Sequence, residues 1–424
     1  MEIRDSIHSL IKYDETEEKL INTSIFQRLR KIKQLALASF VYPGAHHTRF
    51  EHSIGTMHLA EKVARRLELN EEKVKILRLA GLLHDIGHGP FSHVSEQIME
   101  EYADKTLLDK YKAHNTHELM SILLIQKDKE IGNILNQDEK EKIAHILQRQ
   151  EKKSIERDII SGPLDVDKLD YLLRDSYFAG VKYGLFDLDK VIESLTLIEI
   201  GREKTQLGIN EDGIHPVEQL LLAKYHMNTQ VYQHRVRRIT DAMLIRGIKY
   251  ALEEESKEVE NIYRVQDTNE FIENYLKYDD KSLVDTILSN AKGVAREYFK
   301  RIKTRKLLKE VFSAKINETN FPDSVNNEVD SKLVVVDKQT VSNPTFKSPG
   351  VRIDTNTIMV KTMEGGRKSF PQISTIFSNS AVDPEEDILR IYLPLDWIEK
   401  REDRKKFITE RKDKTIEIIE EVLR

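Results

Sequence analysis

Residues 82–93, LLHDIGHGPFSH, place a His-Asp pair at the end of an apolar helical stretch. Glycine and proline then stop the helix, and two further histidines, His88 and His93, follow within the same segment. Neutral imidazole and carboxylate are suitable ligands for a hydrolytic divalent metal, and a helix end lets neighbouring side chains point into one pocket. The segment therefore predicts that His84 and Asp85 bind a metal. The alternative is an ordinary helix C-terminus with a dipole-stabilised histidine and solvated neighbours.

The composition limits which metal this segment can hold. The chain has 424 residues, no cysteine and a formal net charge of −5, and nine of its 14 histidines fall between His46 and His117. Without cysteine there are no disulfides, iron–sulfur clusters or thiolate zinc sites. A metal must then be held by His, Asp and Glu, which points to Mn, Fe, Mg, Ni or a nitrogen-and-oxygen zinc site.

The sequence lacks the marks of a membrane or secreted protein. No apolar run approaches the roughly 20 residues of a membrane span, and the N-terminus MEIRDSIHSL lacks a signal-peptide core. We therefore expect a soluble, cytoplasmic protein with no membrane partner. The 67 basic and 72 acidic residues nearly balance, so only the patch at Arg235, Arg237 and Arg238 could support weak binding of single-stranded nucleic acid.

The spacing of apolar residues predicts a mainly α protein with two parts. Up to about residue 255 these residues recur mostly at helical intervals, which predicts a helical domain over residues 1–255. Two short β-forming runs, 195–200 and 205–209, predict a small hairpin inside it. A long helix is expected to start after Pro216 and to continue past Lys249.

The character of the sequence changes beyond residue 255. Residues 268–314 are expected to be helical. Later β-forming runs are separated by Ser/Asn/Pro-rich and Gly-rich stretches, and lie at residues 332–336, 357–362 and 388–393. This pattern predicts a smaller α+β C-terminal lobe over residues 256–424, with a regulatory or oligomerisation role.

Two further ligand candidates lie outside the histidine-rich segment. His52 opens the expected helix over residues 54–67, and Asp167 lies in DVDKLDYLLRD, residues 165–175. An exposed charged helix is the alternative for the second stretch. Its acids, Lys, Tyr and Arg alternate with leucines that bury the other side, however, and four ligand candidates together favour a metal site.

His52, His84, Asp85 and Asp167 together resemble the H…HD…D signature of the HD-domain metal phosphohydrolases. Several other stretches are similar to the deoxynucleoside triphosphate triphosphohydrolases of the SAM-and-HD-domain type, which are dGTPase-like: residues 26–35, 42–45, 49–53, 84–93 and 165–171. The match runs from about residue 5 to 309, and no SAM domain is expected before it. The resemblance implies an HD-domain helical core in which these four residues bind a divalent metal.

The resemblance also implies a set of catalytic histidines. His117 would be the general acid that protonates the leaving oxygen, with Glu118 as its orienting partner, while His88 and His93 line the phosphates. A histidine can serve as this acid because its unperturbed pKa lies near neutral pH.

The implied substrate contacts cover the triphosphate and the sugar. Arg49, Lys168 and Tyr232 would hold the triphosphate. Gln34 and Asp175 would bind the 3′-hydroxyl, and Leu35 and Tyr171 would close the space that a 2′-hydroxyl needs, which predicts a preference for deoxyribose. Lys224 and Asn228 stand where the family has an Arg and a His, so the phosphate clamp is weaker and an auxiliary acid is missing. The alternative is that these residues are core aromatics and surface amides.

Regulation by nucleotides is implied as well. Gln27 and Arg30 match part of the guanine-reading activator site, but Asn22 replaces the family's acid there. Other residues resemble the allosteric nucleotide contacts: Asp187, His234, Arg235, Arg305, Leu307 and Lys309. The resemblance therefore implies a homo-oligomer, a tetramer or a dimer, that is assembled or activated by a dNTP or GTP; a basic helix surface is the alternative.

These inferences favour an enzyme in which a metal-activated water attacks the α-phosphorus of a dNTP and releases deoxynucleoside and triphosphate. One alternative is an HD-type phosphodiesterase or nuclease acting on single-stranded nucleic acid or a cyclic nucleotide. Another is a non-catalytic nucleotide sensor. Of the clustered histidines, four receive no role from the sequence: His46, His47, His58 and His114.

Overall fold

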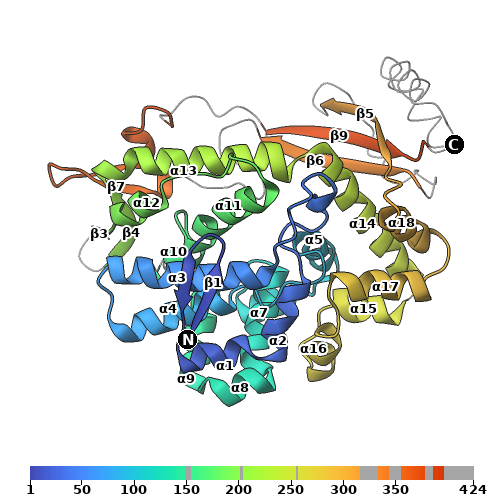
Figure 1. Ribbon diagram of the computed structural model, residues 1–424, viewed down its shortest axis with the longest axis horizontal. Helices are drawn as coiled ribbons and strands as arrows, with labels where there is room; N and C mark the ends of the chain where they lie inside the picture. The colour runs from blue at the N-terminus through green and yellow to red at the C-terminus, as the bar shows by residue number, and fades with distance from the viewer. Residues whose placement is uncertain are drawn as a thin grey trace. The chain divides into compact units, whose positions relative to one another are not determined.

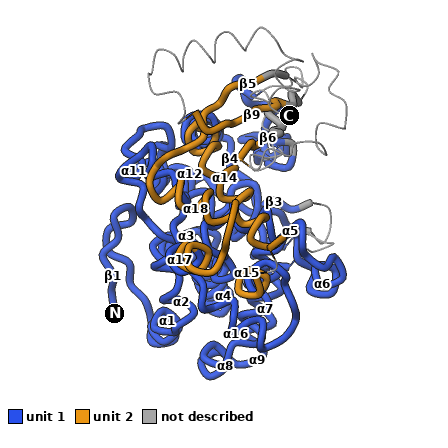
Figure 2. Tube along the Cα trace, turned by 90° about the vertical axis from the view of Figure 1, so that its right-hand side faces the viewer, with its two compact units in different colours: residues 1–232, 261–283, 353–380 blue, residues 233–260, 284–352, 381–424 orange. Residues whose placement is uncertain are grey.

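The computed structural model in Figure 1 describes residues 1–148, 154–200, 204–254, 256–315, 333–342, 355–377 and 385–395. The chain forms two compact units, each made of segments that are far apart in sequence (Figure 2). Unit 1 comprises Met1–Tyr232, Asn261–Leu283 and Ile353–Ser380, and unit 2 comprises Gln233–Glu260, Val284–Arg352 and Ala381–Arg424. The domain boundary at residue 255 stays a prediction, because compact units and independently folding domains need not coincide.

The fold is mainly helical, as the sequence predicts. The helices of unit 1 are α1 (Glu15–Ile21), α2 (Ser24–Arg28), α3 (Arg49–Arg66), α4 (Glu71–Leu83), α5 (His93–Tyr102), α6 (Lys105–Tyr111), α7 (Thr116–Lys127), α8 (Lys129–Ile134), α9 (Gln137–Leu147), α10 (Ile155–Ser161), α11 (Val166–Ala179), α12 (Leu188–Ser194), α13 (Ile214–Met227) and α16 (Asn269–Tyr275). Unit 2 holds α14 (Arg235–Glu253) and α18 (Val294–Lys303), while α15 (Lys257–Tyr263) and α17 (Asp280–Asn290) contribute residues to both units. Among the described helices, none combines the length and apolarity needed to cross a membrane.

The helices α3, α4 and α11 position the metal-ligand candidates. In unit 1, α3 packs along α4 and against α11. The apolar residues Ile54 and Met57 of α3 are 1% and 0% exposed, so this face is core. Gly81 of α4 lies against the backbone of α3, because a Cβ there would approach the carbonyl oxygen of Thr56 to 3.0 Å. This close approach brings the C-terminal end of α4 beside α3.

Side-chain caps fix where these helices begin. The side chain of Glu51 accepts a hydrogen bond from the backbone nitrogen of Thr48 (2.9 Å), which completes a capping box at the start of α3. Asp165 accepts from the backbone nitrogen of Lys168 (2.8 Å) and caps α11. Both caps place the first turn of a helix, and with it His52 and Asp167, at a defined point.

Unit 1 also contains two small sheets. The antiparallel strands β1 (Glu2–Asp5) and β2 (Ser9–Lys12) form an N-terminal hairpin that the sequence analysis did not predict, and β2 contacts α3. The second sheet has the order β3-β4-β7-β8, with strands β3 (Leu195–Ile200), β4 (Lys204–Asn210), β7 (Met359–Lys361) and β8 (Arg367–Ser369). Its antiparallel pair β3 and β4 confirms the predicted hairpin.

Unit 2 combines helices with a three-stranded sheet. Strand β9 (Glu385–Leu393) lies between β5 (Lys309–Lys315) and β6 (Val335–Ser342) and pairs antiparallel with both. Within this unit α14 contacts both β6 and α18. The mixture of helices and strands confirms the predicted α+β character of the C-terminal region.

Two details of the predicted elements are wrong. The long helix expected from Pro216 past Lys249 is broken: α13 ends in a π-helical turn over Asn228–Tyr232, and α14 starts afresh after His234. The Nδ1 atom of His234 accepts a hydrogen bond from the backbone nitrogen of Val236 (3.2 Å), so a side-chain cap, absent from the periodicity, sets the new start. In addition, residues 309–314, expected to be helical, belong to strand β5 because β9 pairs with them.

Candidate metal centre and active site

Four predicted ligands converge in unit 1. His52 comes from α3, His84 and Asp85 from the end of α4, and Asp167 from the first turn of α11. The Nε2 atom of His52 lies 2.9 Å from an oxygen of Asp167 and 3.6 Å from an oxygen of Asp85. The Nε2 atom of His84 lies 3.3 Å from Asp85 and 3.8 Å from Asp167. Each of these four distances between a histidine nitrogen and a carboxylate oxygen is thus below 4 Å.

The surroundings of the two histidines leave their Nε2 atoms free for a metal. His52 Nδ1 lies 2.7 Å from an Asp170 oxygen, and His84 Nδ1 lies 2.8 Å from the carbonyl oxygen of Gly81. Both partners accept hydrogen bonds, so Nδ1 carries a proton and Nε2 is the atom that faces the metal position. Burial would lower the pKa of His52, but Asp167, Asp170 and Asp85 outweigh it and raise this pKa to about 10, so a metal would displace a proton from Nε2. Within the described residues neither buried Nε2 has a hydrogen-bond partner of suitable geometry. This donor set fits a divalent metal with nitrogen and oxygen ligands.

The charges of the site favour ionised carboxylates. Burial alone would raise the pKa of Asp85, but Arg49, His84 and His88 hold it well below its usual range. Burial has the same tendency at Asp167, where His52 and His84 outweigh it and lower its pKa. Both acids therefore remain anionic at neutral pH, as ligands of a cation must be.

The predicted catalytic histidines form a second cluster. The rings of His88 and His117 stack with centroids 4.4 Å apart, and His88 Nε2 lies 3.3 Å from Asp85. His117 Nδ1 contacts one oxygen of Glu96, and His93 Nδ1 lies 2.8 Å from the other. Burial would lower the pKa of His117, but Glu96 outweighs it and raises this pKa to about 9. His117 is therefore protonated at neutral pH, as a general acid must be.

Glu96 takes the place that the sequence analysis gave to Glu118. The carboxylate of Glu118 instead accepts a hydrogen bond from the backbone nitrogen of His114 (2.9 Å), so its role as the partner of His117 is wrong. Glu118 directly follows His117 on α7, and adjacent side chains of a helix point in different directions. Side chains three residues apart, such as those of His93 and Glu96, share a face. The spacing of His93 and Glu96 at the start of α5 is a signal that could have identified the true partner.

The predicted sugar contacts also lie near one another. Asp175 accepts hydrogen bonds from the hydroxyl of Tyr232 and from His47 Nε2, each at 2.7 Å. The backbone nitrogen of Gln34 donates to the carbonyl oxygen of His47 (3.1 Å), while its buried side-chain oxygen has no partner among the described residues. The rings of Tyr171 and Tyr232 are 6.4 Å apart. His47, which received no role from the sequence, thus links Gln34 to Asp175. Leu35, beside Gln34, is buried.

The predicted phosphate-binding cations have different surroundings. Arg49 donates to Asp85 (2.6 Å) and to the hydroxyl of Ser92 (3.0 Å), and Lys168 pairs with Asp165. Lys224 is 4% exposed and has no hydrogen-bond or ion-pair partner in the described parts of the chain. Burial lowers its pKa to about 7. Arg49 and Lys168 each have a close carboxylate partner, so an anionic ligand would stabilise the charged form of Lys224 most.

The predicted regulatory residues are divided between the units. In unit 1, Arg30 donates to the side-chain oxygen of Gln27 (2.9 Å), and Asp187 caps α12. The others belong to unit 2: His234, Arg235, Arg305, Leu307 and Lys309. Their joint role in binding a nucleotide stays a prediction.

The fold and the metal centre correspond to a known class of hydrolase. Residues 49–175 match the HD domain, and residues 186–360 match the HD associated region. The first range contains all four candidate ligands. The chain therefore belongs to the HD-domain phosphohydrolases, whose HD domain binds a divalent metal.

Similar proteins come from distant organisms. An uncharacterized protein of Methanocaldococcus jannaschii, MJ1154, is 37% identical over 285 residues, which cover 67% of this chain and 57% of that protein. The deoxynucleoside triphosphate triphosphohydrolase SAMHD1 homolog of Dictyostelium discoideum is 30% identical over 326 residues, covering 73% and 59%. The chain thus spans a little over half the length of these two relatives. The crystal structure of a hypothetical protein from Aquifex aeolicus is 28% identical with a TM-score of 0.73, and the match covers 97% of this chain and 100% of that one.

Proposed function

We propose that this HD-domain phosphohydrolase is a metal-dependent deoxynucleoside triphosphate triphosphohydrolase. The observation that carries the proposal is Lys224, whose side chain is 4% exposed and which lies within electrostatic range of Asp165 and of the metal-ligand candidate Asp167. Burial, together with the like charge of Lys168, lowers the pKa of Lys224 to about 7 despite these acids. An anion bound beside the metal ligands would favour its charged form. A triphosphate chain supplies such an anion.

The groups around Asp175 support a nucleotide with a free sugar hydroxyl. Asp175 is a buried carboxylate beside Tyr232 and His47. Gln34, whose backbone nitrogen bonds to His47, has a buried side-chain oxygen without a partner among the described residues. Together they offer acceptors to a hydroxyl donor, as a 3′-hydroxyl would require. An internal residue of a nucleic acid has no free 3′-hydroxyl, so this arrangement favours a mononucleotide over a polymer. The similarity to the Dictyostelium triphosphohydrolase supports the same choice.

Nitrogen and oxygen donors would hold the metal through His52 Nε2, His84 Nε2 and the carboxylates of Asp85 and Asp167. This ligand set suits Mn, Fe, Mg, Ni or Zn. When bound, a divalent metal supplies Lewis-acid chemistry, polarising a phosphoryl oxygen and lowering the pKa of a coordinated water.

The reaction breaks the bond between the α-phosphorus and the 5′-oxygen of the deoxyribose. Water contributes the oxygen that the triphosphate gains, and the 5′-oxygen must take up a proton as it leaves. His117 is the residue that holds this proton, because Glu96 keeps its imidazole protonated. Lys224 and Lys168 would neutralise the charge of the phosphates. His88 and His93, whose rings contact each other and, through His88, that of His117, would line the phosphates.

Purified protein incubated with Mn²⁺ and each of the four dNTPs tests the proposal by chromatography of the products. We expect deoxynucleoside and triphosphate from the wild-type protein and no turnover from His84→Ala or Asp167→Ala. Intact dNTPs together with degradation of single-stranded DNA, or hydrolysis of a cyclic nucleotide alone, would contradict it. Tight nucleotide binding without any turnover would favour the sensor instead.

A further inference from the structure

The N-terminal hairpin reaches the metal centre although its sequence lies far from every ligand. Two of its residues, Asp5 at the end of β1 and His8 in the following turn, contact side chains of α11. His8 Nε2 lies 2.7 Å from an oxygen of Asp170, and both side chains are almost fully buried. Asp170 is the same residue that holds Nδ1 of the metal-ligand candidate His52. A single residue, Asp170, therefore connects the hairpin to the metal-ligand candidate His52.

The carboxylate of Asp170 is saturated with donors. One oxygen accepts from His8 Nε2 (2.7 Å) and from Arg174 Nη2 (2.9 Å). The other accepts from His52 Nδ1 (2.7 Å) and from Arg174 Nε (2.8 Å). A carboxylate has about four lone-pair positions, so all of them are used and the plane of the group is fixed. His52 can then have only one orientation and one tautomer.

Asp5 supports both sides of this arrangement. Its carboxylate accepts hydrogen bonds from the backbone nitrogens of Ile7 and His8, each at 2.8 Å, and so shapes the turn that presents His8. It also pairs with Arg174, whose Nη1 lies 2.8 Å away. Arg174 is fully buried between Asp5 and Asp170. Its position therefore requires both carboxylates, because an unpaired buried guanidinium would be costly.

A glycine of α3 makes room for Asp170 and Arg174. Gly55 on α3 lies one helical turn after His52, and a Cβ at this glycine would come within 2.0 Å of an Asp170 oxygen and 2.5 Å of Arg174. The glycine lets the ion pair pass directly under the helix that carries His52. Gly55 thus leaves space for the ion pair between Asp170 and Arg174 in the turn of α3 that follows His52.

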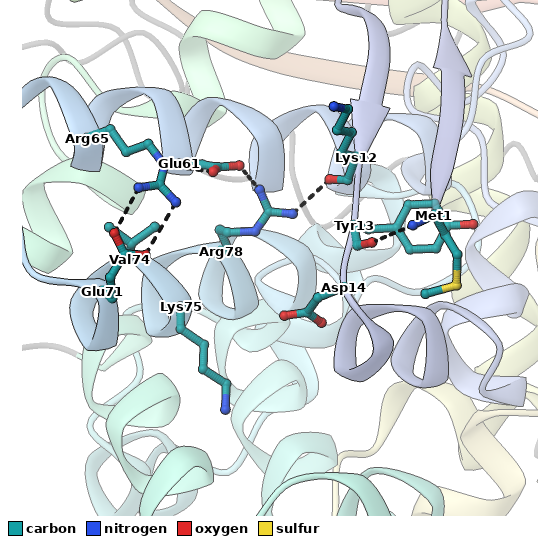
Figure 3. A pocket seen from close by; sticks show the side chains of 10 residues that line it. All are labelled: Met1, Lys12, Tyr13, Asp14, Glu61, Arg65, Glu71, Val74, Lys75 and Arg78. Atoms are coloured by element: carbon teal, nitrogen blue, oxygen red, sulfur yellow. Dashed lines mark hydrogen bonds and ion pairs between the residues drawn. The ribbon is translucent and has the colours of Figure 1, made fainter.

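The base of the hairpin is anchored independently of the metal centre (Figure 3). Arg78 of α4 donates to the carbonyl oxygen of Lys12 (2.9 Å) and pairs with Glu61. The amino group of Met1 donates to the carbonyl oxygen of Tyr13 (3.1 Å). These contacts hold the open end of the hairpin, opposite the turn that carries His8, without involving a metal-ligand candidate.

We propose that the N-terminal hairpin is a structural part of the metal centre, in which His8 is a positioning residue that acts through Asp170 to direct Nε2 of His52 toward the metal. This inference rests on the metal site and not on the identity of the substrate. Partners of this kind, one residue beyond the ligand, commonly change metal affinity by roughly 10–100-fold when removed.

Titration calorimetry of nucleotide-free protein with MnCl₂ tests the inference without any assay of turnover. His8→Phe keeps the ring volume but removes the donor, and His8→Asn has an amide that ends near the position of the imidazole Nδ1, too short to reach Asp170. We expect both variants to bind Mn²⁺ about 10-fold or more weakly. His8→Gln, whose amide nitrogen can stand in for Nε2, is expected to restore most of the affinity.

His58→Phe is the matched control. The ring of His58 lies 5.5 Å from that of His8, and His58 makes no hydrogen bond to Asp170. The control is expected to bind Mn²⁺ like the wild type, and thermal melting of the metal-free proteins reports which variants fold. Folded His8 variants with wild-type Mn²⁺ affinity would overturn the inference, as would a loss of affinity in His58→Phe equal to that in His8→Phe. Either result would leave the proposed reaction standing, since no nucleotide is present.

Discussion

The contact between Glu96 and His117 joins a carboxylate to the histidine that we assign as general acid. Because the pKa of His117 is raised to about 9, the protonated acid is present below that pH and is lost as pH rises through it. Turnover should therefore fall on the alkaline side near pH 9. The measurement is kcat against pH with saturating Mn²⁺ and dNTP.

Glu96→Gln should move this alkaline limb toward lower pH. The amide keeps the shape of the side chain but removes the negative charge that raises the pKa of His117, which should then lie closer to the ordinary value near 6.5. Glu100→Gln is the comparison on the same helix: Glu100 interacts with His117 through its charge but makes no hydrogen bond to it in the described chain, so a smaller shift in the same direction is expected. An unchanged pH profile in Glu96→Gln would show that His117 is not the acid.

Lys224→Met should weaken substrate binding without harming the fold. A charge-assisted contact to a phosphate contributes about 1.5–3 kcal/mol, so we expect KM to rise by roughly 10-fold or more. The metal-free protein should melt at the same or a higher temperature, because the variant removes a buried amino group whose charged form burial disfavours. Steady-state kinetics and thermal melting check both effects, with the exposed Lys182→Met as control. A normal KM in Lys224→Met would exclude the phosphate role.

At the scale of elements, one carboxylate joins two loops of the active site. Asp280, at the start of α17, accepts hydrogen bonds from the backbone nitrogen of Lys33 (3.0 Å) and from that of Phe91 (2.6 Å). The first loop carries Gln34 and the second follows His88. Asp280 therefore holds the proposed sugar and phosphate contacts in one arrangement.

Asp280→Asn should disturb this arrangement. An amide oxygen can accept one of the two hydrogen bonds, while its amino group faces the other donor, and a buried unsatisfied group costs about 1–3 kcal/mol. We expect a lower free energy of unfolding in urea together with a higher KM. Asp279→Asn is the neighbouring control, since Asp279 accepts from the backbone nitrogens of Lys281 and Ser282. Equal effects of the two variants would refute a special role for Asp280.

The sequence predicted the elements that follow local rules. Apolar spacing identified α3, and two β-forming runs identified the β3–β4 hairpin. Ligand chemistry singled out His52, His84, Asp85 and Asp167, which the structure brings together. Long-range partners could not be predicted in this way. His8 and Asp170 are 162 residues apart, and no periodicity connects them. The π-helical turn after α13 was missed for a related reason, because apolar spacing continues through Val231 without showing the extra residue of a π turn.

At the scale of the whole molecule, we propose that nucleotides bound by the predicted regulatory residues promote assembly. Gel filtration with light scattering should show a larger species when dNTPs or GTP are added, and Arg305→Ala with Lys309→Ala should reduce the shift. The physical reason is that these cations would otherwise neutralise the phosphates of a bridging nucleotide. The same mass with and without every nucleotide would remove assembly from the account while leaving catalysis untouched.

The position of bond cleavage tests the central claim most directly. Hydrolysis of a dNTP in ¹⁸O-labelled water with Mn²⁺, followed by mass spectrometry of the products, shows which atom the water attacks. We predict one ¹⁸O atom in the released triphosphate and none in the deoxynucleoside, because the α-phosphorus accepts the water and the 5′-oxygen leaves. Label in a deoxynucleoside monophosphate, released with pyrophosphate, or no consumption of dNTP by metal-loaded protein, would contradict the account.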